Sequence, residues 1–342
     1  MTDARRVVVG ALGGPDVLRV ERTHLPEPGP GQALVRMRAA GLSYADLLLR
    51  SGRYPGGDRP PFVTGWDLVG TVDSLGPTGP RSGDHGVQVG QRVAAYVRRG
   101  GHGTHLLVPS DALVALPDGV DDAQAACLPL NYLTAYQMLH RVARVRPGQR
   151  VLVHGASGGV GTALLELAAL AGARAHGTAS SHKLHAVVRH GGVPVDRRRP
   201  DLTEHLGEAV PGGFDAAFVA GDRRAVETAR ASVRPGGLLV SYGGAVGPGR
   251  ARPPSVLAAL PELARLRLRS LTGPVRVRSY HSSRAVARRP EQARTDLVSL
   301  VDLLAAGRVA PVVAARVPLA EAGEAHRMLA SGDTVGRIVL VP

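Results

Sequence analysis

The chain has 342 residues, enough for two domains with substantial cores, and its 44% hydrophobic and 20% charged residues exclude a disordered protein. Its single cysteine, Cys127, excludes an internal disulfide and a structural zinc site built from several cysteines. The net charge of +14 permits nucleic-acid binding, but the arginines are scattered, and no zinc-finger, helix-turn-helix or aromatic RNA-binding pattern accompanies them. We therefore expect no specific nucleic-acid partner.

The sequence also bears on the compartment. No apolar stretch approaches the roughly 20 uninterrupted residues of a membrane span. The first residues, MTDARRVVVGALGG, lack the long apolar region and the cleavage site of a signal peptide. We expect a cytoplasmic protein without a membrane partner.

The first third of the chain is predicted to be rich in β-strands. Short apolar runs alternate there with glycine and proline, at residues 7–9, 33–38, 68–72, 92–97 and 106–108. Residues 120–141 then read as a helix, because Asp121 and Asp122 suit a first helical turn.

The middle of the chain holds a predicted strand–turn–helix–strand unit. Residues 151–153 form a short apolar strand, four glycines follow, residues 162–171 read as a helix, and residues 173–178 as a second parallel strand. Such a turn lets the backbone approach a pyrophosphate, with the helix N-terminus pointing its free amides at the phosphates. The spacing G-x-x-G-x-x-G also occurs in purely structural turns, so that alternative stays open.

The end of the second strand indicates which dinucleotide binds. A site for NAD usually places an acid there to hold the ribose 2′-hydroxyl, whereas this chain has Thr178, Ser180 and Lys183. Lys183 is the only lysine among the 42 lysine and arginine residues. Hydroxyl groups beside a cation suit a 2′-phosphate, which favours NADP(H). The alternative is an ordinary surface lysine.

The remaining elements continue the α/β alternation. We expect a strand at 214–220, a helix at 225–233, a turn at 235–237 and a strand at 238–242. Helices at 290–307 and around 319–330 precede a last strand at 336–341, which we expect to return to the first domain. The pattern predicts an α/β protein with a doubly wound parallel sheet and a second, β-rich domain.

The whole chain resembles the medium-chain dehydrogenase/reductase superfamily. Within it, the chain is similar to the zinc-free quinone oxidoreductase, or zeta-crystallin-like, group. The branch that it resembles most contains the vesicle amine transport protein-like members. The runs that carry the resemblance are GLSYADLLLRSGRYPG, GWDLVG, GQRVAAY, GTHLLVPSD, LNYLTAYQML, HGASGGVG, GTASSHK, RPGGLLVSYGG, RSYHSS and GRIVLVP.

The resemblance implies a GroES-like catalytic domain from residues 1–127 and 275–342, with a Rossmann NADP(H)-binding domain at 128–274. It implies NADPH as cofactor and a homodimer. Zinc-dependent relatives carry a cysteine where this chain has Ser43, and a His-Glu pair where it has Trp66 and Asp67. We therefore expect no metal site.

The resemblance also assigns site residues. Tyr54, Ser43 and Asp46 are the candidate catalytic residues, with Tyr54 as the proton donor or, alternatively, a packing residue. Ser43 stands where relatives usually carry asparagine, and Arg197 where many carry tyrosine. The candidate cofactor-binding residues are Asn131, Thr134, Gly155, Ser157, Gly158, Gly159, Val160, Gly161, Thr178, Ser180, Lys183, Arg197, Ser241, Tyr242 and Gly243.

The implied reaction is zinc-independent transfer of hydride from NADPH to a quinone or an α,β-unsaturated carbonyl, which is an enone or an enoyl thioester. In such a reaction the cofactor supplies the hydride and the protein stabilises the developing negative charge. The substrate is a small molecule, either free or bound to an acidic carrier protein. The alternative is an NADPH-binding protein with little or no turnover, in a crystallin-like or interaction role.

Overall fold

The computed structural model describes residues 1–54, 56–78, 86–243 and 273–342. The chain forms two compact units, the first from residues 1–52, 57–133 and 283–342, and the second from residues 53–56 and 134–282. Within the described ranges, no helix has the length and apolar character needed to cross a membrane.

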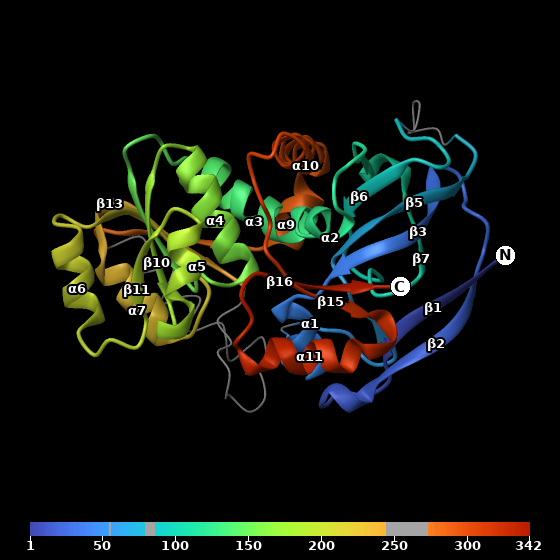
Figure 1. The fold of residues 1–342 in the computed structure, drawn as a ribbon, viewed down its shortest axis with the longest axis horizontal. Helices are drawn as coiled ribbons and strands as arrows, with labels where there is room; N and C mark the ends of the chain where they lie inside the picture. The colour runs from blue at the N-terminus through green and yellow to red at the C-terminus, as the bar shows by residue number, and fades with distance from the viewer. Residues whose placement is uncertain (55, 79–85, 244–272) are drawn as a thin grey trace. The chain divides into compact units, whose positions relative to one another are not determined.

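The first unit is built on two sheets. Its main sheet has the order β15-β16-β3-β5-β6-β8, with β7 paired to β3 (Figure 1). These strands are β3 (Gln32–Gly41), β5 (Asp67–Leu75), β6 (Arg92–Tyr96), β7 (His105–Pro109), β8 (Val114–Ala115), β15 (Val313–Pro318) and β16 (Arg337–Val341). The smaller sheet has the order β2-β1-β4, from β1 (Thr2–Val9), β2 (Leu18–Leu25) and β4 (Phe62–Val63).

Alternating side chains of these strands form the core of the first unit. Ala33, Val35 and Met37 point from β3 to one face of the sheet, where they meet Leu68 and Val93. The α-helices of the unit are α1 (Tyr44–Arg50), α2 (Asp122–Ala125), α9 (Ser282–Arg288, from residue 283 on), α10 (Pro290–Ala305) and α11 (Ala322–Ser331). The sheet therefore confirms the strands expected at residues 33–38, 68–72, 92–97 and 106–108.

The last strand of the chain joins this unit, as expected. β16 pairs antiparallel with β3 through Val339 opposite Gly41 and Leu340 opposite Ala40. A buried ion pair reinforces the join, because Arg337 at the start of β16 contacts Asp67, and their side chains are 2% and 0% exposed. Asp67 also accepts a hydrogen bond from the Gly41 backbone N–H at 2.7 Å. Both charges therefore have partners, which offsets the cost of burying them.

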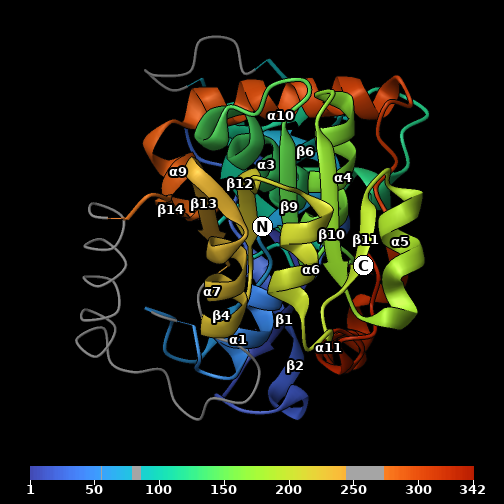
Figure 2. The ribbon, with the colours of Figure 1, turned by 90° about the vertical axis from the view of Figure 1, so that its left-hand side faces the viewer.

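The second unit is a parallel sheet of order β11-β10-β9-β12-β13-β14. Its strands are β9 (Arg150–His154), β10 (Arg174–Ala179), β11 (Val193–Asp196), β12 (Phe214–Val219), β13 (Val233–Tyr242) and β14 (Arg276–Tyr280). The order runs outward in both directions from β9, so right-handed connections place helices on both faces (Figure 2). These are α4 (Gly159–Leu170), α5 (Leu184–Arg189), α6 (Leu202–Ala209) and α7 (Arg223–Ala231). The doubly wound sheet is confirmed.

The helical segment expected at residues 120–141 is confirmed, although it is not one regular helix. After α2, π-helical stretches at Leu128–Tyr132 and Gln137–Ala143 flank a short α-helix, α3 (Leu133–Tyr136). Pro129 has no backbone N–H to donate, and the N–H of Tyr132 reaches back to the Cys127 carbonyl at 3.2 Å. The turn expected at 235–237 lies inside β13, whose pairing with β12 skips from Val233 to Leu238.

The first unit also buries a histidine on α11. His326 is fully buried, and neither ring nitrogen has a hydrogen-bond partner among the described residues. Burial, with smaller contributions from nearby His102 and Arg50, lowers the pKa of His326 to about 3. The folded protein therefore holds this ring neutral at pH values where the unfolded chain protonates it.

We predict that His326→Leu flattens the acid dependence of stability. As the pH falls from about 6.5 toward about 3, the unfolded chain binds a proton that the folded one excludes, so stability falls. The slope is at most about 1.4 kcal/mol per pH unit. Urea unfolding at several pH values measures it, with the exposed His185→Leu as control. The same slope in His326→Leu as in the unchanged protein would contradict this prediction.

Candidate functional site

Residues 155–161, called the glycine loop below, join β9 to α4. Gly155 has a φ of +75°, a conformation that favours glycine. The backbone N–H groups of Gly155 and Ala156 both donate to the carbonyl of Thr178, at 3.1 and 2.9 Å. The loop is thereby fixed to the end of β10, the neighbouring strand.

Two glycines allow close packing of this loop. A Cβ atom on Gly161 would lie 2.3 Å from the Gly155 carbonyl oxygen, so α4 can start here only without a side chain. A Cβ on Gly177, in β10, would lie 2.6 Å from Val187 and 2.7 Å from Ala156. The sequence analysis missed Gly177, although its position inside a predicted strand was a signal of close approach.

Gly155 and Gly158 are less crowded. A Cβ on Gly155 would meet no atom within 4 Å, and one on Gly158 only the Gly155 carbonyl oxygen at 3.6 Å. Gly158 caps α4 without a side chain, so no capping side chain occupies the N–H groups of Gly159, Val160 and Gly161. Open space beside the amino end of a 12-residue helix suits a phosphate group.

A second group of polar side chains lies at the end of β10. Thr178, Ser180 and Lys183 are all buried, with exposed fractions of 1%, 2% and 6%. A short 3-10 helix, Ser181–Lys183, brings Lys183 back beside Ser180, whose carbonyl accepts the Lys183 backbone N–H at 2.8 Å. A buried hydroxyl and a buried ammonium group on one turn fit a phosphate.

The acid on the neighbouring strand, opposite Ala179, is held by other contacts. Asp196, at the end of β11, accepts hydrogen bonds from the Ser181 hydroxyl at 2.6 Å and from the Arg198 backbone N–H at 2.9 Å. The next residue, Arg197, donates its backbone N–H to the Ala179 carbonyl at 2.9 Å, and its side chain is exposed. The end of β10 therefore presents hydroxyl groups and a cation, with an exposed arginine beside them.

The remaining residues predicted in the second unit lie on β13 and α3. Parallel strands end at one edge of a sheet, so Ser241 and Tyr242 at the end of β13, and Gly243 after it, share an edge with the glycine loop. Tyr242 is buried, which raises the pKa of its phenol. Thr134 lies in α3 and is buried, as is Asn131 in the π-helical stretch of the first unit.

His154, the last residue of β9, directly precedes the glycine loop. Its Nδ1 lies 3.2 Å from the Ala220 carbonyl oxygen, and burial lowers the pKa of the ring.

In the first unit, Ser43 and Asp46 lie together at the start of α1. The Asp46 carboxylate accepts from the Ser43 backbone N–H at 2.8 Å and from its hydroxyl at 2.6 Å. Its other oxygen accepts from the Gly65 N–H at 3.0 Å. Asp46 is fully buried, so these bonds fix α1 against the segment that leads to Trp66.

The third candidate catalytic residue, Tyr54, belongs to the second unit and is half-buried. Its neighbour in the sequence, residue 55, lies outside the described residues. Among the described residues, no group of three or more histidine, cysteine, aspartate and glutamate side chains is arranged to hold a metal ion.

Two segments of the chain match models of known protein families. Residues 29–118 match the model of the alcohol dehydrogenase GroES-like domain. Residues 192–340 match the model of the zinc-binding dehydrogenases.

Three relatives illustrate the similarity. The quinone oxidoreductase of Pseudomonas aeruginosa is 33% identical, over 99% of this chain and all of its own length. One component of the phenolphthiocerol/phthiocerol polyketide synthase of Mycobacterium tuberculosis is 32% identical over 98% of this chain, which spans only 15% of that protein. A mouse synaptic vesicle membrane protein VAT-1 homolog-like protein is 31% identical over 70% of this chain and 57% of its own length.

Solved structures share the fold. The crystal structure of the Escherichia coli quinone oxidoreductase complexed with NADPH has a TM-score of 0.86 to this chain, at 26% identity. The similarity covers 99% of this chain and all of that one. The fold expected from the sequence is thus confirmed.

We predict that Gly161→Ala disrupts the glycine loop. The added Cβ would overlap the Gly155 carbonyl and Ala156, which are backbone neighbours that cannot rotate away. We expect a loss of about 1–3 kcal/mol of stability. Gly207→Ala, in α6 with no atom within 4 Å of the new Cβ, is the matched control and is expected to stabilise by about 0.5–1 kcal/mol. Thermal unfolding compares the two, and equal stability would contradict the prediction.

Proposed function

We propose that this protein is an NADPH-dependent reductase. The chain belongs to the quinone oxidoreductase group of the medium-chain dehydrogenase/reductase superfamily. Its acceptor is a quinone or an α,β-unsaturated carbonyl. The observation that carries the proposal is the pairing of an open glycine loop with buried Ser180 and Lys183 at the end of β10. The NADPH complex of the similar Escherichia coli quinone oxidoreductase supports the choice of cofactor.

All but one of the groups proposed to hold NADPH belong to the second unit, and the exception is Asn131. The backbone N–H groups at the start of α4 suit the pyrophosphate, and the Ser180 hydroxyl and Lys183 ammonium suit the 2′-phosphate. Arg197 adds an exposed cation for the adenosine side. The remaining proposed contacts are Ser157, Val160 and Thr178 around the phosphates, and Asn131, Thr134, Ser241, Tyr242 and Gly243 toward the nicotinamide.

Bound NADPH supplies the hydride, and the protein must stabilise negative charge on the substrate oxygen. We assign that hydrogen bond, and for an enone the proton that follows, to the Tyr54 phenol. Ser43 already donates its hydroxyl proton to Asp46, so it offers the substrate an acceptor. Asp46 uses both carboxylate oxygens on Ser43 and Gly65, so it acts as a positioning residue.

Further features of the proposal come from the resemblance. We propose that the reaction needs no metal ion, since Ser43 and Trp66 replace the metal-binding cysteine and histidine of zinc-dependent relatives. We also propose a cytoplasmic homodimer. The match to a polyketide synthase supports an acyl group on an acidic carrier protein as one form of the substrate.

The function is tested by mixing the protein with NADPH and a panel of quinones, enones and enoyl thioesters. We expect loss of the reduced-nicotinamide absorbance with at least one class. If no member of the panel is reduced above background while NADPH still binds, the alternative holds, which is a cofactor-binding protein without turnover.

We predict that Lys183→Ala weakens NADPH binding and leaves NADH binding unchanged. The lost charge-assisted contact corresponds to about 1.5–3 kcal/mol, or about ten- to a hundred-fold in affinity. Fluorescence titration of each nucleotide measures the effect. Arg174→Ala, an exposed cation at the opposite end of β10, is the control. An unchanged ratio of NADPH to NADH affinity would refute the role of Lys183.

We predict that Tyr54→Phe slows enone reduction by about 10²–10⁴-fold with little change in NADPH affinity. The rate of quinone reduction is expected to fall less. The oxygen of the hydroquinone product can take its proton from water, and no carbon atom of the product has to be protonated. Steady-state rates with one enone and one quinone separate the two cases. Small and equal losses of rate with both substrates would show that Tyr54 only packs against its neighbours and has no chemical role.

A further inference from the structure

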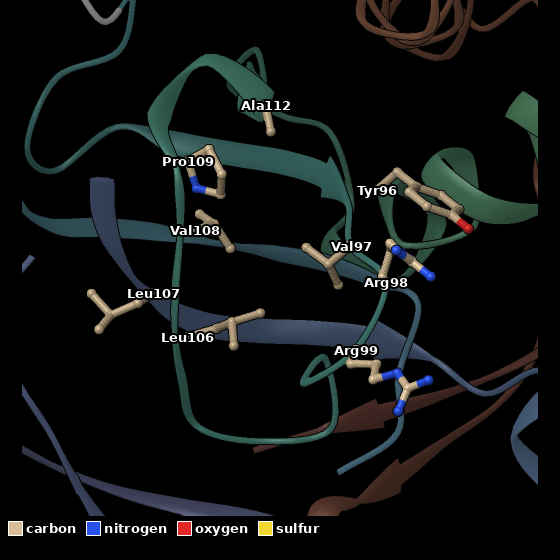
Figure 3. Close-up of a pocket in the computed structure, with 9 residues that line it drawn as sticks. All are labelled: Tyr96, Val97, Arg98, Arg99, Leu106, Leu107, Val108, Pro109 and Ala112. Atoms are coloured by element: carbon tan, nitrogen blue, oxygen red, sulfur yellow. The ribbon is translucent and has the colours of Figure 1, made fainter. Parts of the chain in front are cut away.

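The first unit contains a hollow that the proposed function does not use. It lies between the end of β6 and strand β7, with a volume of about 660 Å³ (Figure 3). This is within the range of about 300–1,000 Å³ typical of small-molecule sites. All the residues that line it belong to the first unit.

One side of the hollow is apolar and opens onto the core of the main sheet. Leu106 and Val108 point to the same side of β7, toward Val97 after β6 (Figure 3). Val97 and Val108 belong to the hydrophobic core, and Leu106 packs against it half-buried. Val97 and Val108 are only 9% and 3% exposed, so an alkyl chain placed here would contact mainly Leu106, above the apolar core.

The other side of the hollow is positively charged. Arg98 and Arg99 follow β6 and line the hollow beside Tyr96, and no acidic side chain lines it. Arg99 forms an ion pair with Asp58. Arg98 is exposed, and the described part of the chain gives it no hydrogen bond or ion pair. The charge at the rim therefore favours an anion.

Backbone hydrogen bonds hold the charged side in place. The Val97 N–H donates to the Trp66 carbonyl at 2.9 Å, and the His102 N–H donates to the Thr64 carbonyl at 3.1 Å. The segment that carries Arg98 and Arg99 is thus tied at both ends to residues 64–66. A ligand would meet a backbone that is already in place, and only the exposed Arg98 side chain would have to be ordered on binding.

We propose that this hollow binds a medium-chain acyl carboxylate, with the alkyl chain on Val97, Leu106 and Val108 and the carboxylate beside Arg98. The combination of an apolar floor and a cationic rim is what selects an amphipathic anion over a neutral or cationic molecule. The inference concerns the first unit alone and needs no nucleotide, so it stands or falls independently of the reductase proposal.

Calorimetric titration of the full chain without nucleotide tests the proposal, with decanoate, decanol and decyltrimethylammonium as probes. We expect saturable binding of decanoate, weaker binding of decanol by about two- to fivefold, and the weakest binding of the cation. Shortening the carboxylate is expected to weaken binding by up to about fourfold per methylene group. Absence of saturable decanoate binding, or equal binding of all three probes, would overturn the proposal.

Three variants test whether decanoate binds in this hollow. Arg98→Gln is expected to lower decanoate affinity about two- to fivefold and to leave decanol unchanged. Arg5→Gln removes an exposed arginine of β1 outside the hollow and is the control. Ala112→Trp, in the short helix after β7, fills the hollow and should abolish binding of both. Decanoate affinity unchanged by Arg98→Gln, or retained in a folded Ala112→Trp protein, would show that the ligand binds elsewhere.

Discussion

The close approach of α4 to the carbonyl of Gly155 is the constraint on which the second unit depends. A Cβ at Gly161 would stand 2.3 Å from that oxygen, so the helix can begin where it does only with glycine there. The same turn brings the N–H groups of Gly155 and Ala156 onto the Thr178 carbonyl. The backbone of the glycine loop thus places the N-terminus of α4 beside open space and next to the end of β10.

A comparable constraint organises the first unit. Asp67 and Arg337 are charged and buried, and each has further partners, the Gly41 N–H for Asp67 and the Ala126 carbonyl for Arg337 at 3.1 Å. Removing one partner of such a pair typically costs about 3–5 kcal/mol, because the other charge stays buried. A Cβ on Gly41 would overlap the Arg337 guanidinium. The interaction joins the last strand of the chain, β16, to strand β5 of the same sheet.

Most of the fold could be predicted from the spacing of apolar residues and from the glycines and prolines that separate the elements. Apolar runs gave the strands, and the glycine turn between strand and helix gave the parallel unit, because these patterns are local. The helix at 162–171 instead begins at Gly159, since its first turn is made of the glycines that looked like loop. The π-helical stretches were missed because a hydrogen bond shifted by one residue, as from the Tyr132 N–H to the Cys127 carbonyl, leaves the helical pattern of the sequence unchanged. The bulge in β13 was missed because it depends on the pairing with β12.

The candidate site was predictable to different degrees. Lys183 stood out because the chain has no other lysine, and Ser180 because its hydroxyl lies beside that cation in the sequence. Both prove to be buried on one turn. The engagement of Asp46 by Ser43 and Gly65 could not be read from the sequence, since Gly65 is far along the chain. The hollow beside β7 likewise forms from segments whose spacing carries no motif.

The central claim is that the end of β10 recognises a 2′-phosphate. Competitive titration with two nucleotide fragments, 2′,5′-ADP and 5′-AMP, tests it most directly, because they differ only in that group. The account predicts that 2′,5′-ADP displaces NADPH at concentrations about ten- to a hundred-fold lower than 5′-AMP does. Equal displacement by the two fragments would contradict it.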